Sequence, residues 1–159
     1  MAEEINDFDE DTQKGKFLTF GIDREVYGIE IRAVTEIVSL QEITEIPEVP
    51  DYIKGIINLR GRIIPVMDIR LRFKKAFRVY NERTCVIIVE VRDLAIGLIV
   101  DEVAEVIFID DHHIVSKPEM KSVQNNYIKN IGKVDEKIKL ILDCEKLIHA
   151  EDEELLKNI

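Results

Sequence analysis

An internal repeat constrains the fold of this chain more than any other feature of its sequence. Residues 17–38 align without a gap on residues 86–107, so that Gly28 falls on Gly97 at an offset of 69 positions (97 − 28). Each copy contains two short runs of alternating apolar residues around a charged two-residue break, a pattern typical of a β-hairpin. A duplicated hairpin predicts two related β units rather than one undivided domain.

A second hairpin follows in the first copy, over residues 55–71. Two apolar runs flank a charged tip in which Gly61 can supply the positive φ of a tight reversal. Pro65 lacks an N–H group, which predicts a sheet edge or an irregularity at that point. Asp68 is placed to cap a short helix. A looser version of the same pattern occupies residues 129–143 and also ends on an aspartate.

The strand pattern predicts an all-β protein built from two small antiparallel barrels or sandwiches. Units of about 70 residues have small cores, so we expect them to pack against each other. The second copy supports this, because polar strand positions of the first copy become apolar there: Thr19, Glu25 and Glu30 correspond to Ile88, Leu94 and Ile99. The expected organisation is a flexible acidic tail (residues 1–16), a first unit (17–82), a second unit (83–147) and a C-terminal helix (148–159).

The charge balance restricts the possible partners. The chain of 159 residues has 22 basic and 32 acidic residues and a net charge of −10. This balance repels nucleic acid and anionic lipid, so proteins are the expected partners. The acidic N-terminus is no signal peptide and no apolar run is long enough to span a membrane, which predicts a cytoplasmic protein. Cys85 and Cys144 have no disulfide or metal-site spacing and are expected to be buried and reduced.

Catalytic motifs are absent from the sequence: it contains no Gly-rich phosphate loop, GxSxG, HExxH or CxxC. His112 and His113, with neighbouring aspartates, have the chemistry of metal ligands, but a solvated loop is the favoured interpretation because adjacent residues rarely point at one ion. Glu36 and Glu105 recur at equivalent places without a nucleophile or base nearby. We therefore expect no catalytic residue, no metal and no cofactor.

Three runs of the sequence resemble the CheW family of chemotaxis coupling proteins: FLTFGIDREVYGIEIRAVTEI, PDYIKGIINLRGRIIPVMDIRLRF and CVIIVEV…LAIGLIVDEVAEV. The resemblance extends from about residue 17 to residue 147. It implies two tandem five-stranded SH3-like or OB-like β-barrel subdomains on a shared apolar core, with short helices. It also implies a non-enzymatic adaptor, recruited to membrane-associated receptor arrays, that couples the histidine kinase CheA to the cytoplasmic tips of chemoreceptors.

The resemblance assigns two sets of contact residues. The receptor-binding set is Ile31, Val34, Glu36, Lys54, Gly55, Arg60, Val103 and Val106. In it, the aliphatic residues would line a groove for a receptor helix, Arg60 would face a carboxylate, and Glu36 with Lys54 would set the register by charge. The kinase-binding set is Val115, Glu119 and Met120, which would contact the regulatory domain of CheA. Val115 stands where the family usually has a basic residue.

Two alternatives remain open from the sequence. The regulatory domain of CheA is itself similar to CheW, so an isolated regulatory module of a CheA-type kinase is one. The other is a barrel that binds oligosaccharide or nucleic acid, which usually offers aromatic stacking platforms and basic stripes. The sequence has no Trp and a negative net charge, and both features disfavour this second alternative.

Overall fold

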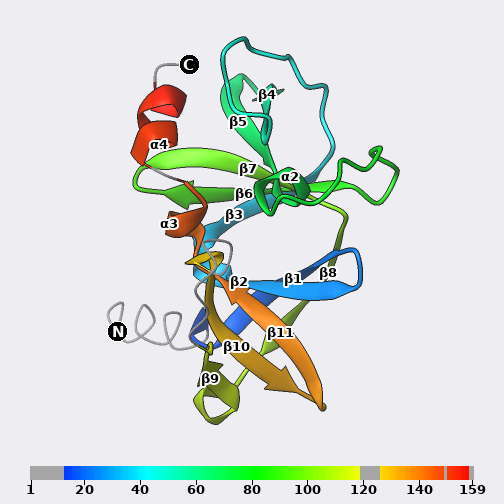
Figure 1. Ribbon diagram of the computed structural model, residues 1–159, viewed down its shortest axis with the longest axis vertical. Helices are drawn as coiled ribbons and strands as arrows, with labels where there is room; N and C mark the ends of the chain where they lie inside the picture. The colour runs from blue at the N-terminus through cyan, green and yellow to red at the C-terminus, as the bar shows by residue number, and fades with distance from the viewer. Residues whose placement is uncertain (1–12, 119–125, 149, 158–159) are drawn as a thin grey trace, which may run out of the picture.

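The computed structural model describes residues 13–118, 126–148 and 150–157, which form two β-sheets and a few short helices (Figure 1). The six-stranded sheet has the order β8 (Glu102–Phe108), β1 (Lys16–Ile22), β2 (Glu25–Glu30), β11 (Lys137–Leu142), β10 (Ile128–Val134), β9 (Ile114–Ser116). The five-stranded sheet has the order β3 (Val34–Ser39), β6 (Cys85–Val91), β7 (Leu94–Val100), β5 (Arg62–Asp68), β4 (Ile53–Leu59). The helices are η1 (Ile31–Ala33), α2 (Ile69–Arg72), η2 (Asp111–His113), α3 (Cys144–Leu147) and α4 (Ala150–Lys157).

The predicted all-β class is confirmed, but the sheets are open rather than closed barrels. In the five-stranded sheet, β3 and β4 are the two edges and do not form a ladder with each other. The connection between them crosses the gap and adds only an isolated bridge, in which Thr44 pairs with Ile56 of β4. Because this bridge replaces a full ladder, the barrel remains unclosed on that side.

The duplication appears directly in the strand order. Under the sequence repeat, the order β8-β1-β2-β11-β10 of one sheet corresponds to β3-β6-β7-β5-β4 of the other. However, β3 of the first copy pairs with β6 of the second, and β8 of the second copy pairs with β1 of the first. The copies therefore exchange strands, and the chain crosses between the sheets at η1 and again at Asp101.

This exchange places the division between the sheets away from residues 82 and 83, the boundary that the repeat suggests. The five-stranded sheet is contiguous over residues 34–100, whereas the six-stranded sheet combines residues 16–30 with 102–142. The expected acidic tail lies outside the described residues up to residue 12. At the other end, α4 lies within residues 148–159, where a C-terminal helix was expected, and α3 precedes it.

The largest apolar cluster lies between the two sheets. The six-stranded sheet contributes buried side chains such as Phe20, and the five-stranded sheet contributes Ile87 and Leu98. On β6 the next residue, Ile88, is equally buried but faces a second cluster on the other side of the five-stranded sheet. The strands β6 and β7 of the second copy are thus covered on both faces, as their apolar sequence predicts. A third, smaller cluster covers the outer face of the six-stranded sheet.

The tip and end of the β4–β5 hairpin also follow the sequence prediction. Arg60 and Gly61 both have positive φ, 51° and 89°, as a two-residue hairpin turn requires. At the end of β5, the Asp68 carboxylate accepts a hydrogen bond from the Leu71 N–H at 3.3 Å and caps α2. Asp143 caps α3 in the same way, which confirms the looser copy of the motif.

Pro65 lies in an interior strand, yet it leaves no hydrogen bond unmade. Its partner on β4 is Ile56, whose N–H and C=O both bond to Thr44 on the side away from β5. Pro65 and Ile56 are therefore a non-hydrogen-bonded pair, and the ring nitrogen faces β7. The parallel β5–β7 ladder begins only at Val66, one residue later. The strand is thus a local edge at the proline, as the sequence suggests.

Two arginines hold the C-terminal helices against the five-stranded sheet. Arg72 of α2 is buried and donates from Nε to the Leu147 carbonyl at 2.8 Å. Arg92, in the β6–β7 turn, donates to the Ile148 carbonyl at 3.2 Å and to the Glu153 carboxylate at 3.0 Å. These bonds satisfy carbonyl groups that the short helix α3 leaves free.

Cys85 and Cys144 are half-buried at the margin of the inter-sheet cluster, rather than fully buried as expected. Desolvation, reinforced by nearby carboxylates, raises the pKa of Cys144 to about 12. Among the described residues, no helix is long and apolar enough to cross a membrane.

Candidate partner-binding surface

The four aliphatic residues that the resemblance assigns to receptor binding lie along the rim of the inter-sheet cluster. Val34, at the start of β3, is opposite Val89 of β6, and Val103 of β8 is opposite Phe20 of β1. Residues opposite each other in a ladder share a face, and Val89 and Phe20 both belong to the inter-sheet cluster. Val34 and Val103 therefore border that cluster from the two exchanged strands.

Ile31 joins the two sides of this rim. It lies in η1, where the chain passes from the six-stranded to the five-stranded sheet, and this short helix contacts both β1 and β6. Its side chain is half-buried against the same cluster. Val106 extends the rim along β8 and is 50% exposed.

Ile37 completes the rim, although the sequence reasoning missed it. It is opposite Ile87 of the inter-sheet cluster, and its side chain is 42% exposed. The repeat offers the signal that would have found it, because Ile37 corresponds to Val106 at the offset of 69 (106 − 37). We refer to Ile31, Val34, Ile37, Val103 and Val106 as the rim surface.

The charged members of the receptor-binding set lie apart from the rim surface, where the two edges of the five-stranded sheet approach each other. Arg60, at the tip of the β4–β5 hairpin, donates from Nη2 to both carboxylate oxygens of Glu36 on β3, at 2.7 and 2.8 Å. Glu36 is opposite Ile88 and so is on the other face of β3 from Ile37. The two side chains that were expected to meet a partner thus first pair with each other.

Lys54 and Gly55 are neighbours on β4 but differ in role. The Lys54 ammonium lies 4.9 Å from the ring centroid of Phe77, a cation–π contact, and makes no ion pair with Glu36. Gly55 is buried with φ at +144°, and a Cβ at this position would lie 2.1 Å from the Thr44 carbonyl oxygen. Gly55 therefore permits the close approach of Thr44 that the bridge to β4 requires.

Only one member of the kinase-binding set lies within the described residues. Val115 is in the edge strand β9, opposite Ile131 of β10, and its side chain is 37% exposed. Glu119 and Met120 lie outside the described residues.

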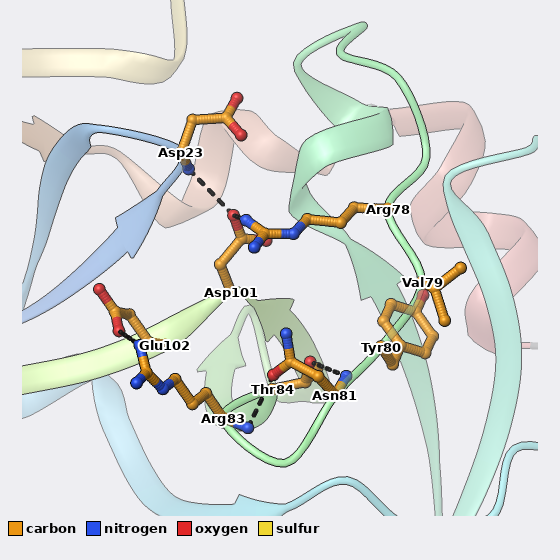
Figure 2. Close-up of a pocket in the computed structure, with 9 residues that line it drawn as sticks. All are labelled: Asp23, Arg78, Val79, Tyr80, Asn81, Arg83, Thr84, Asp101 and Glu102. Carbon is orange, nitrogen blue, oxygen red and sulfur yellow. Dashed lines mark hydrogen bonds and ion pairs between the residues drawn. The ribbon is translucent and has the colours of Figure 1, made fainter.

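A polar hollow of about 200 Å³ lies where the chain crosses between the sheets (Figure 2). Asp101, at the crossing, accepts hydrogen bonds from the backbone N–H of Asp23 at 2.9 Å and from the guanidinium of Arg70 at 2.9 Å. Figure 2 shows Arg78 beside the same carboxylate, at 3.5 Å, and Arg83 beside Glu102. Each charged group that lines the hollow has a partner of opposite charge, and these ion pairs hold the crossing segment in place.

The Asp23 carboxylate makes this crossing sensitive to acid. The hydrogen bond from Arg70 lowers the pKa of Asp23 below its usual value of 3.8. A carboxyl group whose pKa is lower in the folded than in the unfolded protein stabilises the fold at any pH above its unfolded-state pKa. This contribution disappears as the pH falls through the folded-state pKa. The Asp23 contribution should therefore be present at neutral pH and be lost below about pH 4.

We expect the thermal midpoint to be lower at about pH 3 than at about pH 6, and this decrease to be smaller in Asp23→Asn than in the wild type. Circular dichroism melts at the two pH values measure both shifts. Asp93→Asn is the matched control, because Asp93 occupies the equivalent β6–β7 turn and makes no ion pair with a described residue. Equal acid sensitivity of wild type and Asp23→Asn would contradict the assignment.

Asp110, beside the histidine pair, has a structural role. Asp110 accepts a hydrogen bond from the His112 N–H at 3.0 Å and so caps η2. Within the described ranges, no three His, Cys, Asp or Glu side chains are grouped so that they could hold a metal.

The fold and its surfaces define a class of protein: a duplicated two-sheet scaffold whose most distinctive feature is an apolar rim where the strands exchange. Comparison with known proteins identifies the family. The model of the CheW-like domain matches residues 16–152, and the chain belongs to this family of chemotaxis scaffold proteins.

Similar proteins cover nearly the whole chain. It is 34% identical to the chemotaxis protein CheW of Klebsiella aerogenes over 145 residues, which are 91% of this chain and 87% of that protein. It is 33% identical to the chemotaxis protein CheW of Bacillus subtilis over 137 residues, 86% of this chain and 88% of that one. The crystal structure of the scaffolding protein TtCheW from Thermoanaerobacter tengcongensis superposes with a TM-score of 0.81 at 39% identity, covering 87% of this chain and 94% of that chain.

Proposed function

We propose that this chain is a non-enzymatic adaptor that couples the histidine kinase CheA to chemoreceptors, the methyl-accepting chemotaxis proteins, at the cytoplasmic side of receptor arrays. Membership of the CheW-like family supports the chemotaxis role. The observation that carries the coupling proposal is the rim surface, where Ile37 and Val106 remain 42% and 50% exposed at equivalent positions of the two copies. An exposed apolar stripe of this kind favours a partner protein.

The rim surface suits the apolar face of a receptor helix. Its aliphatic side chains lie on two edge strands and are joined by η1, so a helix could lie across the end of the inter-sheet cluster. Packing there would remove Ile37 and Val106 from water. Complete burial of an exposed aliphatic side chain contributes about 1.5 to 3 kcal/mol, and each of these two, already half covered, would contribute roughly half of that.

Arg60 would provide the polar part of the receptor contact. Its Nη2 bonds to Glu36, and within the described residues Nε and Nη1 have no bond, so they could donate to a receptor carboxylate. Glu36 would keep the guanidinium in position while that contact forms. In this proposal Lys54 and Gly55 support the same hairpin, and the kinase contact uses Val115 of the edge strand β9 together with Glu119 and Met120.

The receptor proposal predicts that Arg60→Glu weakens binding to a receptor fragment. The variant replaces the guanidinium by a carboxylate and places it against Glu36, so both attraction for the partner and orientation of the hairpin are lost. We expect affinity to fall roughly tenfold or more, as for loss of a charge-assisted contact, in a pull-down with the cytoplasmic fragment of a receptor. Arg62→Glu, just beyond the same turn and without an ion pair to a described residue, is the matched control.

Circular dichroism would show whether both variants keep the native fold. The Arg60 side chain is exposed, so we expect the thermal midpoint of Arg60→Glu to remain close to that of the wild type. Unchanged receptor affinity in a folded Arg60→Glu variant would rule out the proposed role of Arg60.

The kinase proposal predicts a complex with the regulatory domain of a CheA from the same cell. Mixing the two purified proteins should produce an earlier peak in size-exclusion chromatography, and Val115→Asp should reduce that peak. Because Val115 is on the short edge strand β9 and partly exposed, the change should leave the sheets intact. Elution of the two proteins as separate peaks at micromolar concentration would count against the kinase role.

A further inference from the structure

A groove with an aromatic floor and a charged rim opens on the inner face of the six-stranded sheet, beside the end of α2. It is a groove of about 490 Å³, which we refer to as the α2 groove, lined by Glu25, Tyr27, Phe73, Lys74, Lys75, Tyr127, Ile128 and Leu140. None of these residues belongs to the rim surface. The strands β2 and β11 that form one side are separated from the edge strand β8 by β1.

The floor of the groove is aromatic and rigid. The Phe73 ring lies between Tyr27 and Tyr127, with centroid distances of 5.3 and 5.4 Å. Both tyrosines are buried, and Tyr27 is opposite Leu140 in the parallel β2–β11 pairing. Packed aromatic rings lose little conformational entropy when a partner covers them, so this floor is well suited to binding.

An exposed apolar residue, Ile138, lies next to the groove on the same face of the sheet. Ile138 precedes Leu140 by two residues on β11, so the two side chains share one face of the sheet. Ile138 is 60% exposed, and its cross-strand partner on that face is Lys133 of β10. Figure 1 shows the β10–β11 hairpin extending away from the five-stranded sheet.

The rim of the groove carries two lysines, Lys74 and Lys75, and one carboxylate, Glu25. Lys133 extends the positive charge past Ile138. Lys75 is held near Asp23 and Glu25, with N–O distances of 3.7 and 3.8 Å. The ammonium groups of Lys74 and Lys133 make no ion pair with any described residue. The full chain of 159 residues has a net charge of −10.

We propose that the α2 groove is a second docking site, which binds an acidic segment of another protein that also carries large apolar side chains. The apolar side chains would pack on Phe73, Leu140 and Ile138, and the carboxylates would pair with Lys74 and Lys133. Charge complementarity selects this occupant over a second copy of the chain, because two copies carry a net charge of −10 each and repel one another. None of the residues of the α2 groove belongs to the receptor-binding or the kinase-binding set.

The experiment is a fluorescence-anisotropy titration of the full chain with a short labelled peptide in which Asp and Glu alternate with Leu and Phe. We expect saturable binding that weakens as salt rises, because part of the attraction is between opposite charges. Ile138→Asp should weaken binding about tenfold, since it removes an apolar contact and adds a repelling charge. Lys74→Glu should weaken it and reduce the salt dependence.

Two controls test whether binding is specific to the α2 groove and to acidic peptides. Ile63→Asp changes an isoleucine of similar exposure, 54%, at the tip of the five-stranded sheet, and should bind the peptide like the wild type. A peptide with Lys in place of every acidic residue tests the charge requirement. The thermal midpoints of the exposed-site variants should match that of the wild type, which confirms that all are folded.

Several results would overturn the proposal: no binding of the acidic peptide, equal binding by Ile138→Asp, or equal binding of the basic peptide. So would a concentration-dependent dimer in sedimentation that Ile138→Asp abolishes, because the occupant would then be a second copy. Failure here leaves the proposed adaptor function intact, since receptor and kinase binding by Ile138→Asp are measured separately and are expected to be unchanged.

Discussion

Gly55→Ala should destabilise the protein by more than about 3 kcal/mol, the range of the most damaging single substitutions. Two effects combine at this position. The backbone φ is +144°, which an L-amino acid with a Cβ rarely adopts, and the added Cβ would lie 2.1 Å from the Thr44 carbonyl oxygen. That oxygen belongs to main chain and accepts the Ile56 N–H, so relief of the overlap would break the bridge that covers the β4 edge.

Urea denaturation followed by circular dichroism measures the loss, and Gly61→Ala is the matched control. Gly61 also has positive φ, +89°, but nothing lies within 4 Å of a Cβ built there. Its replacement should cost only about 1 kcal/mol. A Gly55→Ala variant as stable as the Gly61→Ala variant would contradict the close approach. Because Gly55 was expected to contact the receptor, any binding defect of its variants should be judged against their loss of stability.

Arg72→Ala should destabilise the protein by about 3 to 5 kcal/mol, the usual cost of removing one partner of a buried ion pair. The Arg72 guanidinium is stacked between the rings of Tyr52 and Tyr127, with its carbon 4.3 and 4.9 Å from their centroids. It also bonds to the Leu147 carbonyl and lies 4.0 Å from the buried Asp152 carboxylate. The truncation leaves that carbonyl without a donor and the carboxylate without its cation.

The loss should be concentrated in the C-terminal helices. Amide hydrogen exchange should accelerate most in α4, where Asp152 accepts the Tyr52 hydroxyl hydrogen bond and depends on Arg72 for neutralisation. Arg62→Ala is the control, because Arg62 is exposed at a hairpin tip and pairs with no described residue. Equal exchange in α4 of Arg72→Ala and wild type would show that Arg72 does not hold these helices in place.

Much of the local structure could be predicted from the sequence because local chemistry decides it. Alternating apolar residues specify the strands, and the Arg60–Gly61 turn follows from the freedom of glycine at positive φ. The helix caps at Asp68 and Asp143 follow from the capacity of a carboxylate to accept a free N–H. The burial of β6 and β7 also follows, since strands that are apolar on both faces must be buried on both.

The rim surface was predicted except for Ile37. The resemblance supplied Ile31, Val34, Val103 and Val106, and the repeat adds Ile37 once the two copies are compared position by position. The Glu36–Arg60 pair was missed because it joins residues from opposite edges of one sheet. No periodicity or spacing along the chain indicates which edges will approach each other.

The sequence by itself determined the strands, their turns and caps, the duplication and the family. Only the tertiary structure decided how the copies combine: β3 pairs with β6, β8 pairs with β1, and the chain crosses between the sheets at η1 and Asp101. The physical reason is the duplication itself. Because the two copies offer nearly equivalent strands, each third strand could pair within its own copy or with the other. The choice depends on packing between distant residues, which local sequence does not encode.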